Sequence, residues 1–574
     1  MRIINIILGI ACLSMPFAMS AQNIFDKINT SELSQLQEKL MQDYCKENIS
    51  TVEVYRIQEQ AFDNTRLSFS YENTLFKFEG SKRQIENQEA FYWEGIDVVN
   101  NAKISLFNYN GKVTGAFTHL EISHEIQDLE NAVIIYRTPE FQIELNDQLI
   151  PEEGAASEST THSLLAGEAE CKVRVLVAYS NQANIPGRDF HFYAEARMND
   201  LNTQFNNSAI GHQAELACVA HLNYNEPTVI DYPGCTSVQC EAVYELQANA
   251  NLIALRNLYD ADIVMVVLNQ GSGIAFREPS SEWAFGAISW DNFTIASAKT
   301  FSHELGHTYG CYHNTEESPI VGNSKHGYNA DLDGAANWRT ILSYQSGCGC
   351  SRIDHFSNPN EYVGGVPTGS NPNVHNCAGK INDRASDVAD FRLSQDNKII
   401  TADNLNNTDD YVYVYGHETI NTSGNYTVGN GAVARFRATD CVGLSNGFKV
   451  SNGGQFQIYN GSCGNNIPGI IAETEERTIP TNTGEEMAQT DLKISPNPLS
   501  SHANIEFYNT KARNVSLFIS DVEGKLIRSI LDNEWQDKGM INFTLTNDIG
   551  LKGMYFCTIV YEDQYIQKKF IVLK

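Results

Sequence analysis

The chain has 574 residues, which at roughly 150 residues per domain suggests about four folding units. Hydrophobic residues make up 42% and charged residues 19%, so packed cores are expected, and the wholly disordered and collagen-like classes are excluded. Lys and Arg total 40 against 70 Asp and Glu, and the net charge of -30 disfavours nucleic acid and anionic lipid surfaces as partners.

The first 21 residues follow the pattern of a secretory signal peptide. Arg2 precedes an apolar run from Ile4 to Leu13, and small residues follow up to Ala21. The run has about ten apolar residues, whereas a membrane-spanning helix needs about 20. We therefore predict a signal peptide at 1–21 and an exported protein whose mature form has no transmembrane segment.

Cysteine usage agrees with export. Eight of the 13 cysteines fall between residues 171 and 377, an even number in an exported chain, which predicts a domain stapled by disulfides. The spacing does not fix the pairing. Cys235 and Cys240, which flank a short loop, are the clearest candidates for a local bridge.

Residues 22–167 combine a helical leucine pattern near their start with alternating, strand-like runs such as Thr74 to Phe78 and Ala132 to Tyr136. The segment ends at 152–163 in a stretch rich in Glu, Ala, Ser and Thr. That composition indicates an exposed linker, which is a natural point of cleavage. We predict an α+β domain followed by this linker.

Residues 168–395 alternate between strand and helix patterns, which argues for an α/β sheet layer. Gly310 is expected to end the last helix, because glycine best adopts the left-handed conformation found there. We predict strands at 172–178, 214–222 and 262–269, a short edge strand at 286–290, and helices at 190–205, 241–259 and 295–309.

The remaining chain is predicted to be β-rich. Residues 396–471 contain short alternating runs broken by Asn-Gly and Gly-Gly turns, with no solenoid-scale repeat evident and with Cys441 and Cys463 as the only possible cysteine pair. Residues 472–490, rich in Glu, Thr and Pro, are expected to be a linker, and 491–574 an all-β domain.

The residues that indicate chemistry lie in the segment His-Glu-Leu-Gly-His-Thr-Tyr-Gly-Cys-Tyr-His, which begins at His303. On a helix, His303 and His307 share one face and can bind one metal ion at about 2.0 to 2.1 Å. Glu304 lies on the adjacent flank, where a carboxylate can act as general base toward a water on that ion. Gly310 allows a sharp turn that returns His313 as a third ligand. Three protein ligands leave one position open, as in catalytic zinc sites.

This segment matches HExxHxxGxxH, the pattern of the metzincin clan of zinc endopeptidases, at all five fixed positions. Over about residues 171–395 the chain resembles the bacterial reprolysin-like and peptidyl-Asp-type metallopeptidases, and the Tyr-His ending is also similar to the pappalysin-like group. The resemblance implies a metzincin-like α/β catalytic domain, a mixed twisted sheet plus an active-site helix, with one catalytic Zn²⁺. The stretches that carry it are VRVLVAYS (173–180), NWRTILSY (337–344), HFSNPN (355–360) and VADFR (388–392).

Two positions depart from the metzincin pattern, and the role of a third residue has two interpretations. Leu342 stands where metzincins have a Met in the turn beneath the metal, a nearly volume-conserving change that should retain zinc. Asn314 stands where many reprolysins have Asp after the third His, which affects support of the ligands. Tyr344 corresponds to the Tyr that stabilises the oxyanion in astacin-like and serralysin-like enzymes; the alternative is a buried structural Tyr.

Residues 22–167 occupy the place of the family's inhibitory propeptides. Cys45 and Cys171 are candidates for a thiolate that blocks the open zinc position, with an inert Cys45 thiol and a disulfide-bonded Cys171 as the favoured alternative. The run Asp331–Gly334 resembles a fragment of a calcium loop whose other ligands are missing, so Ca²⁺ is only weakly supported and a solvated turn is favoured.

Residues 491–574 resemble the carboxy-terminal sorting domain of type IX secretion. The likeness implies the type IX machinery as a partner, passage through the outer membrane of a Bacteroidetes-type bacterium, and a secreted or cell-attached product. A generic adhesive β-sandwich is the alternative. The stretches that carry the likeness are ISPNPLSS (494–501), DVEGK (521–525), GMY (553–555) and 568–574.

The sequence therefore predicts a secreted zinc endopeptidase, made as a precursor, that hydrolyses peptide bonds in proteins or peptides. Its general base is Glu304, assisted by Tyr344, and its metal ligands are His303, His307 and His313. The alternative is a catalytically weak or inactive surface binding or adhesion protein on a metzincin scaffold, which Leu342 alone supports.

Overall fold

The computed structural model groups the chain into two compact units, Met1–Ile479 and Pro480–Lys574. Residues 1–20 of the predicted signal peptide, the predicted linker at 152–163, residues 474–490 of the second predicted linker, Cys171 and Cys463 lie outside the described residues. No helix among the described residues is long and apolar enough to cross a membrane. The structure describes residues 21–45, 52–85, 90–120, 122–138, 147–149, 172–370, 374–395, 397–401, 404–405, 410–416, 418–439, 441–445, 447–460, 471–473, 492–495, 502–509, 511–520, 526–546, 553–561 and 564–572.

The amino-terminal part of the first unit is a closed barrel with a single α-helix, α1 (Gln35–Tyr44), so it is more strand-rich than the predicted α+β domain. Alternating side chains such as Phe76 and Phe78 fill the barrel interior, as expected for strands with one buried face. Its strands are β1 (Gln22–Ile28), β2 (Val52–Ile57), β3 (Arg66–Tyr71), β4 (Thr74–Gln84), β5 (Ala90–Asp97), β6 (Ala102–Tyr109), β7 (Lys112–His119), β8 (Ile122–Asp128) and β9 (Ala132–Arg137).

The middle of the chain forms a mixed sheet covered by helices on both faces, which agrees with the predicted α/β layer. The helices are α2 (Phe190–Asn207), α3 (Val238–Gln247), α4 (Ala250–Leu258), α5 (Trp290–Thr294), α6 (Thr300–Thr308) and α7 (Cys377–Ala389). The sheet runs in the order β10 (Gln148–Leu149), β14 (Gly273–Phe276), β15 (Phe285–Ser289), β13 (Ile263–Leu268), β11 (Lys172–Tyr179) and β12 (Gln213–His221).

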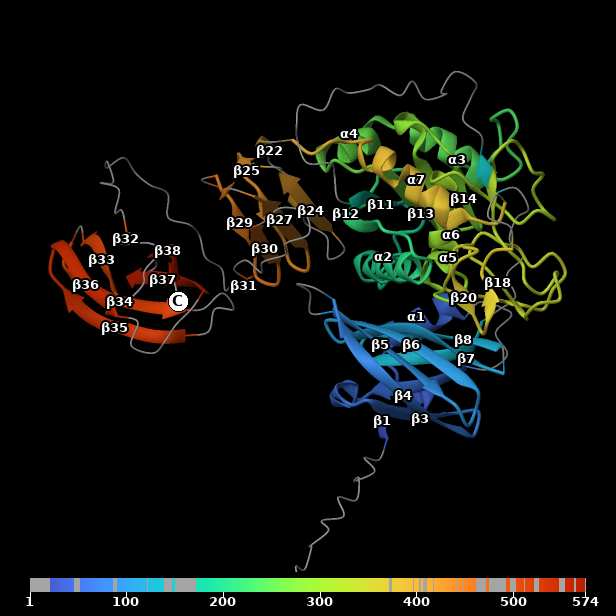
Figure 1. The fold of residues 1–574 in the computed structure, drawn as a ribbon, viewed down its shortest axis with the longest axis horizontal. Coiled ribbons are helices and arrows are strands. Elements are labelled where there is room, and N and C mark those ends of the chain that lie inside the picture. The colour runs from blue at the N-terminus through green and yellow to red at the C-terminus, as the bar shows by residue number, and fades with distance from the viewer. Residues whose placement is uncertain are drawn as a thin grey trace, which may run out of the picture. The chain divides into compact units, whose positions relative to one another are not determined.

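Successive side chains of β11 point to opposite faces of the sheet, and both faces are buried. Val173, Val175 and Val177 pack into the cluster that contains residues of α2, α6 and α7, whereas Leu176 and Ala178 pack into the cluster with α3 and α4. Figure 1 shows α2 lying between this sheet and the blue barrel. Helix α6, which carries the His303–His307 segment, therefore lies on the same face of the sheet as α2.

The structure corrects two predictions in this region. The strand predicted at 286–290 is β15, which is not at the edge but lies between β13 and β14. The strand at this edge of the sheet is the two-residue β10, which pairs with β14. The helix predicted at 295–309 is shorter, because Lys299 adopts a φ of 54° and separates α5 from α6. Gly310, with a φ of 95°, follows the end of α6 as predicted.

Short two-stranded ladders connect the segments after α6. The backbone hydrogen bonds of these ladders hold the loops that follow α6 in place, although no large sheet forms there. They are formed by β16 (Cys311–Tyr312) with β17 (Lys325–His326), β18 (Trp338–Arg339) with β19 (Ser351–Arg352), and β20 (Tyr362–Val363) with β21 (Val366–Pro367).

Residues 397–473 contain a repeat that the sequence prediction missed. Three parallel ladders begin at 397, 419 and 441, at 404, 427 and 449, and at 411, 433 and 455, spacings of 22 or 23 residues. The repeat is hard to see in the sequence because most stacked side chains differ, as in the apolar set Val412, Ala434 and Phe456 and the set Tyr413, Arg435 and Gln457. The strands are β22 (Asn397–Thr401), β23 (Asn404–Leu405), β24 (Tyr411–Gly416), β25 (Thr419–Ser423), β26 (Thr427–Val428), β27 (Val433–Ala438), β28 (Cys441–Gly443), β29 (Lys449–Val450), β30 (Gln455–Asn460) and β31 (Ile471–Glu473).

This solenoid continues the catalytic sheet. β24 pairs antiparallel with β12 through Cys218 and Val412, and β27, β30 and β31 follow it in the same ten-stranded sheet. An exposed edge strand is a site for unwanted pairing, and here the solenoid covers the β12 edge. Residues 172–395 are therefore joined to the solenoid by backbone hydrogen bonds.

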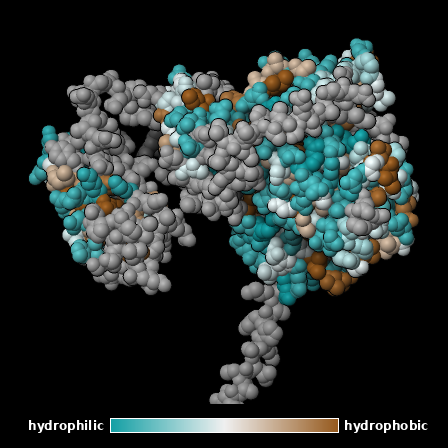
Figure 2. Space-filling model, turned by 45° about the horizontal axis from the view of Figure 1, so that its top comes forward, coloured by the Kyte–Doolittle hydropathy of each residue, from teal (hydrophilic) through white to brown (hydrophobic). Residues whose placement is uncertain are grey.

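The second unit is all-β, as predicted, with a three-stranded and a four-stranded sheet around one apolar cluster. Hydrophilic side chains cover much of the visible face of the described residues in Figure 2, in keeping with the net charge of -30. The strands of the second unit are β32 (Lys493–Ser495), β33 (His502–Asn509), β34 (Arg513–Ser520), β35 (Leu526–Gln536), β36 (Gly539–Thr546), β37 (Gly553–Tyr561) and β38 (Gln564–Val572).

Candidate metal centre

Helix α6 carries two of the three histidines that form the candidate metal centre. All nine residues of α6 are buried, and His303 and His307 lie one turn apart on one face. Gly310 then turns the chain, with its N–H donating to the His307 carbonyl at 2.8 Å, and the strand β16 leads to His313. The three predicted ligands therefore come together.

The ring nitrogens of these histidines converge closely. Nε2 of His307 lies 3.2 Å from Nε2 of His303 and 3.0 Å from Nε2 of His313. Nδ1 of His303 lies 2.7 Å from the Ile341 carbonyl, and Nδ1 of His307 lies 2.8 Å from the Cys311 carbonyl. A proton on Nδ1 satisfies each carbonyl, which leaves the Nε2 lone pairs of these two rings facing the centre.

Asp147, just before β10, completes the cluster from the amino-terminal part of the chain. Its carboxylate oxygens lie 3.1 Å from Nε2 of His303, 3.4 Å from Nε2 of His307 and 2.7 Å from Nε2 of His313. All four side chains are buried. The sequence prediction did not include Asp147.

The donor set fits a divalent metal ion. Ligands held at about 2.0 to 2.1 Å around a tetrahedral ion lie about 3.3 to 3.4 Å apart, close to the separations among these four donors. Burial lowers the pKa of His303 to about 3, an effect that the nearby Asp147 partly opposes, so its ring is neutral at pH 7 and can act as a ligand. Converging nitrogen lone pairs repel one another unless a cation lies between them. The described residues thus form a three-histidine, one-carboxylate site.

Glu304 follows His303 on α6 and lies close enough to Asp147 to feel its charge. Its side chain is buried, and Oε2 has no hydrogen-bond partner among the described residues. Burial and then the charge of Asp147 raise the pKa of Glu304 well above its usual value. The carboxylate fits against β14 only because Gly273 has no side chain: a Cβ there would lie 2.2 Å from Glu304 Oε1.

Tyr344 also reaches the centre. Its hydroxyl donates to Asp147 Oδ2, and its ring centroid lies 4.1 Å from that of His313. Asn314 holds the Tyr344 backbone in place, since Asn314 Oδ1 accepts a 2.9 Å hydrogen bond from the Tyr344 N–H. The residue that departs from the family pattern after the third histidine therefore links the ligand segment to the Tyr344 turn.

Leu342 forms the floor beneath α6. It is fully buried, and a Cβ added at Gly306 would lie 2.6 Å from Leu342 Cδ2, so the helix and this side chain are in close contact. The preceding residue, Ile341, supplies the carbonyl that orients His303. A leucine therefore fills the position where the sequence comparison expected a Met.

His326 is a further supporting residue that the sequence analysis missed. Its Nδ1 lies 2.7 Å from the His313 carbonyl, and its Nε2 lies 2.7 Å from Ser324 Oγ. The signals for His326 and Gly273 were weak, because an isolated His or Gly between motifs has many structural explanations. Asp147 lies 156 residues before His303, so no local spacing could indicate it.

The other sequence candidates lie elsewhere. Cys45 packs in an apolar cluster with α1, and burial raises its pKa to about 11, as an inert thiol requires. Asp331 lies within reach of Cys348 and Cys350, but those two cysteines form a disulfide and offer no thiolates. The predicted Cys235–Cys240 bridge is present. Cys311 and Cys377 are buried thiols, so the disulfide bonding predicted for the cysteines between 171 and 377 is only partly found among the described residues.

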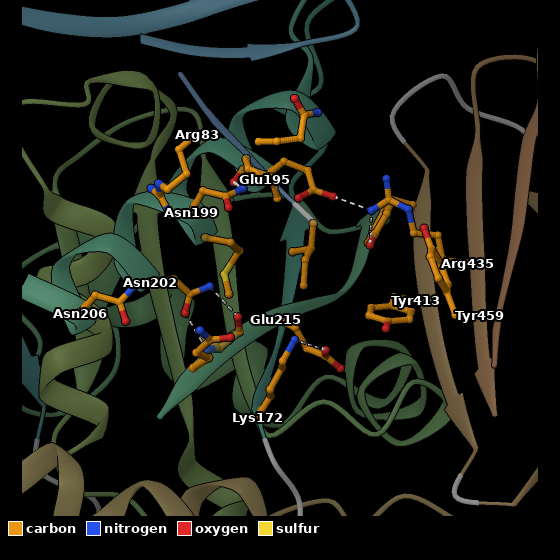
Figure 3. A pocket seen from close by; sticks show the side chains of 17 residues that line it. Arg83, Lys172, Glu195, Asn199, Asn202, Asn206, Glu215, Tyr413, Arg435 and Tyr459 are labelled. Carbon is orange, nitrogen blue, oxygen red and sulfur yellow. Dashed lines mark hydrogen bonds and ion pairs between the residues drawn. The ribbon is translucent and has the colours of Figure 1, made fainter. Parts of the chain in front are cut away.

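A separate polar cavity of about 290 Å³ lies where β4, α2, β12 and the solenoid meet (Figure 3). Its charged side chains are already paired: Arg435 Nη1 lies 3.0 Å from Glu195 Oε1, and Lys172 Nζ lies 3.7 Å from Glu215 Oε2. The cavity does not include the histidine cluster. The first pair links the solenoid strand β27 to α2, and the second links the neighbouring strands β11 and β12.

The helix-flanked sheet and its buried histidine cluster define a metallopeptidase, and the comparisons with known proteins agree. Residues 168–357 match metallo-peptidase family M12, and residues 493–573 match the secretion system C-terminal sorting domain. More particularly, these matches support a reprolysin-like metallopeptidase domain at residues 168–357, followed by a type IX sorting tail at residues 493–573. The tail indicates an extracellular or cell-surface location.

Several known proteins are similar to this chain. A peptidyl-Asp metalloendopeptidase of Xanthomonas campestris pv. campestris is 26% identical over 314 residues, which cover 52% of this chain and 71% of that protein. One from Stenotrophomonas maltophilia (strain R551-3) is 27% identical over 231 residues, 38% of this chain and 52% of that protein. A solved chaperone-substrate complex reaches a TM-score of only 0.32 at 16% identity over 50% of this chain and 44% of that one, too low to bear on the fold.

Proposed function

We propose that this protein is a secreted zinc endopeptidase in which His303, His307 and His313 hold one Zn²⁺ and Glu304 is the general base. The observation that carries the proposal is the convergence of three imidazole Nε2 atoms with separations of 3.0 and 3.2 Å between neighbours. Neutral imidazoles at such a site are the ligands that zinc prefers in catalytic centres.

His303, His307 and His313 would hold the Zn²⁺, which when bound would supply Lewis-acid activation of a water and of the peptide carbonyl. Glu304 accepts the proton of the attacking water and passes it to the amine of the leaving peptide. Its unpartnered Oε2 is available for both transfers. The Tyr344 hydroxyl, which now donates to Asp147, supports the proposal that it donates to the oxyanion once substrate replaces that carboxylate.

We propose that β14 binds the substrate as an extended strand. β14 is the last strand before β10, so without β10 its outer N–H groups would be available. Main-chain hydrogen bonding of this kind gives affinity for protein or peptide substrates, and side-chain pockets give selectivity. The names of the similar proteins make a peptide with Asp beside the scissile bond the first substrate to test.

We further propose that the protein is made as a precursor, with six parts in chain order. The type IX machinery would carry it across the outer membrane of a Bacteroidetes-type bacterium before the sorting domain is removed. The parts are a signal peptide (1–21), a propeptide (22–167), the catalytic domain (168–395), the β-rich module (396–471), a linker (472–490) and the sorting domain (491–574).

The test uses the full chain with a site for a sequence-specific protease inserted within 152–163. After cutting, the amino-terminal fragment is removed through a tag under mild urea, and the remainder is assayed for bound zinc and for cleavage of casein. We expect cleavage by the wild type, loss of at least 10²-fold in Glu304→Gln with zinc retained, and no loss in the exposed control Glu282→Gln.

The alternative function is a surface binding or adhesion protein on the same scaffold. The wild type would then bind zinc but cleave neither casein nor Asp-containing peptides, and Glu304→Gln would not differ from it. That result would overturn the enzymatic proposal.

A further inference from the structure

We propose that Arg352 is a specificity-determining residue: its guanidinium binds the carboxylate of an acidic side chain next to the scissile bond. This inference rests on the proposed function, because it names the substrate group that the same site would select. The names of the similar proteins refer to Asp, but they identify no residue that would recognise it.

Arg352 lies in the wall of the candidate metal centre. It is on β19, which pairs with β18 so that Arg352 stands opposite Arg339. Its Nη1 donates to the Ala298 carbonyl at 2.6 Å, shortly before α6 begins, and its Nη2 donates to the Ser343 carbonyl at 3.2 Å. The guanidinium is therefore held between the start of α6 and the turn that carries Tyr344.

Arg352 and its neighbour Arg339 are buried without a carboxylate partner in the described part of the chain. They are 9% and 8% exposed, and the hydrogen bonds of both guanidinium groups go to backbone carbonyl oxygens. Nε of Arg352 has no hydrogen-bond partner among the described residues. The nearest acidic residue in the sequence, Asp354, is paired with Lys299 at 2.7 Å. Arg352 therefore keeps one donor for a group that the described residues do not supply.

A guanidinium buried without a counter-ion is costly, because it loses its hydration and gains no ion pair in return. Burial and then the charge of Arg352 lower the pKa of Arg339 to about 9, so the two cations repel each other. A carboxylate brought by the substrate would offset this cost. The forked donors of arginine suit a carboxylate better than the single ammonium group of lysine does.

The Arg352 guanidinium is close enough to the centre for its charge to act on the groups around the metal position. Burial and then Asp147 raise the pKa of Glu304, and the charge of Arg352 opposes this rise. Burial also raises the pKa of Tyr344, again against the charge of Arg352. Glu304 and Tyr344 are the residues that would act on the scissile bond in the proposed mechanism. A side chain next to that bond can therefore reach Arg352.

The first test measures kcat/KM on two peptides that differ only in one residue next to the scissile bond, Asp or its neutral isostere Asn. The protein is the full chain, cut within 152–163 and freed of its amino-terminal fragment as in the test of the proposed function. We expect the wild type to prefer the Asp peptide by on the order of 10²-fold, because Asn leaves the Arg352 charge unpaired. Arg352→Gln should lower kcat/KM at least tenfold more on the Asp peptide than on the Asn peptide.

Arg256→Gln is the matched control. Arg256 is also buried and also donates to backbone carbonyls, those of Ala261 and Asp262, but it lies on α4, across the sheet from α6. Any loss in this variant should be the same on both peptides. Equal losses on both peptides in Arg352→Gln would overturn the proposal, because Arg352 would then only support the loops that it binds.

Arg352→Lys provides a second variant if Arg352→Gln does not fold. It keeps the charge but loses the forked donors, so the preference for the Asp peptide should fall at least threefold. An unchanged preference in this variant would also overturn the proposal.

A binding measurement separates recognition from catalysis. The zinc-loaded Glu304→Gln protein is titrated with the same two peptides, and their Kd values are measured by fluorescence anisotropy. We expect the Asp peptide to bind at least tenfold more tightly, and Arg352→Gln in the same background to remove the difference. If the zinc-loaded wild type cleaves neither peptide, the proposed function fails, and this titration decides the role of Arg352 by itself: equal Kd values would overturn it.

Discussion

The change of Gly273 to Ala tests how the carboxylate of Glu304, the proposed general base, is positioned. The Gly273 backbone has a conformation that any L residue can adopt, so the effect of Gly273→Ala is steric rather than conformational. The new methyl carbon would lie 2.2 Å from Glu304 Oε1 and 2.7 Å from Thr300 Cγ2. Relief to an ordinary contact near 3.4 Å requires the carboxylate to move by more than about 1 Å.

Such a displacement of a reacting group costs about 10²-fold in rate, or about 2.7 kcal/mol in transition-state stabilisation. The assay is kcat/KM on a peptide substrate with the fragment-free protein, together with zinc content. We expect kcat to fall with zinc retained, because the proposed general base Glu304 would act in the transition state and is not one of the proposed ligands. Gly211→Ala is the matched control, since its Cβ would meet nothing closer than 3.8 Å. Activity of Gly273→Ala within twofold of the wild type would refute the steric reasoning.

Three further predictions concern stability and release. In urea unfolding, Leu342→Ala should lower the free energy of unfolding by about 2 to 5 kcal/mol, whereas Leu342→Met should lower it by less than about 1.5 kcal/mol. Equal losses for the two substitutions would mean that Leu342 does not form the floor beneath α6. Burial lowers the pKa of His124 to about 4, so stability present above pH 6.5 should be lost as the pH falls toward 4, by up to about 3 kcal/mol. Hydrogen exchange in β7 and β8 would detect this, and His124→Phe should abolish the dependence. In the chain cut within 152–163, Asp43→Asn should speed fragment release on the order of 10²-fold by leaving Arg188 without its carboxylate, and an unchanged rate would contradict that role.

The ligand histidines were predictable because their relation is local. His303 and His307 follow from helical spacing, and the position of His313 follows from the turn at Gly310, whose φ of 95° favours glycine. The strands and helices of the catalytic sheet were predictable for a similar reason, since their apolar periodicity is continuous over six or more residues. Long, regular patterns specify element type before any tertiary contact forms.

The features that sequence alone did not reveal depend on distant contacts. Asp147 reaches the centre only because β10 pairs with β14, and β14 is a four-residue strand without a clear alternating pattern. The strand at 286–290 was predicted to lie at an edge, but a five-residue apolar run alone cannot distinguish an edge strand from an interior one. The solenoid was missed because its repeat conserves backbone register, as between Val412 and Ala434, rather than side-chain identity.

X-ray absorption at the zinc edge of the intact full chain tests the central claim most directly. Three histidines and Asp147 predict a four-coordinate ion with three nitrogens and one carboxylate oxygen at about 2.0 to 2.2 Å. The Asp147→Ala chain should keep the three nitrogens and change only the oxygen contribution. A sulfur scatterer at about 2.3 Å, or a shell without imidazole scattering, would contradict the account.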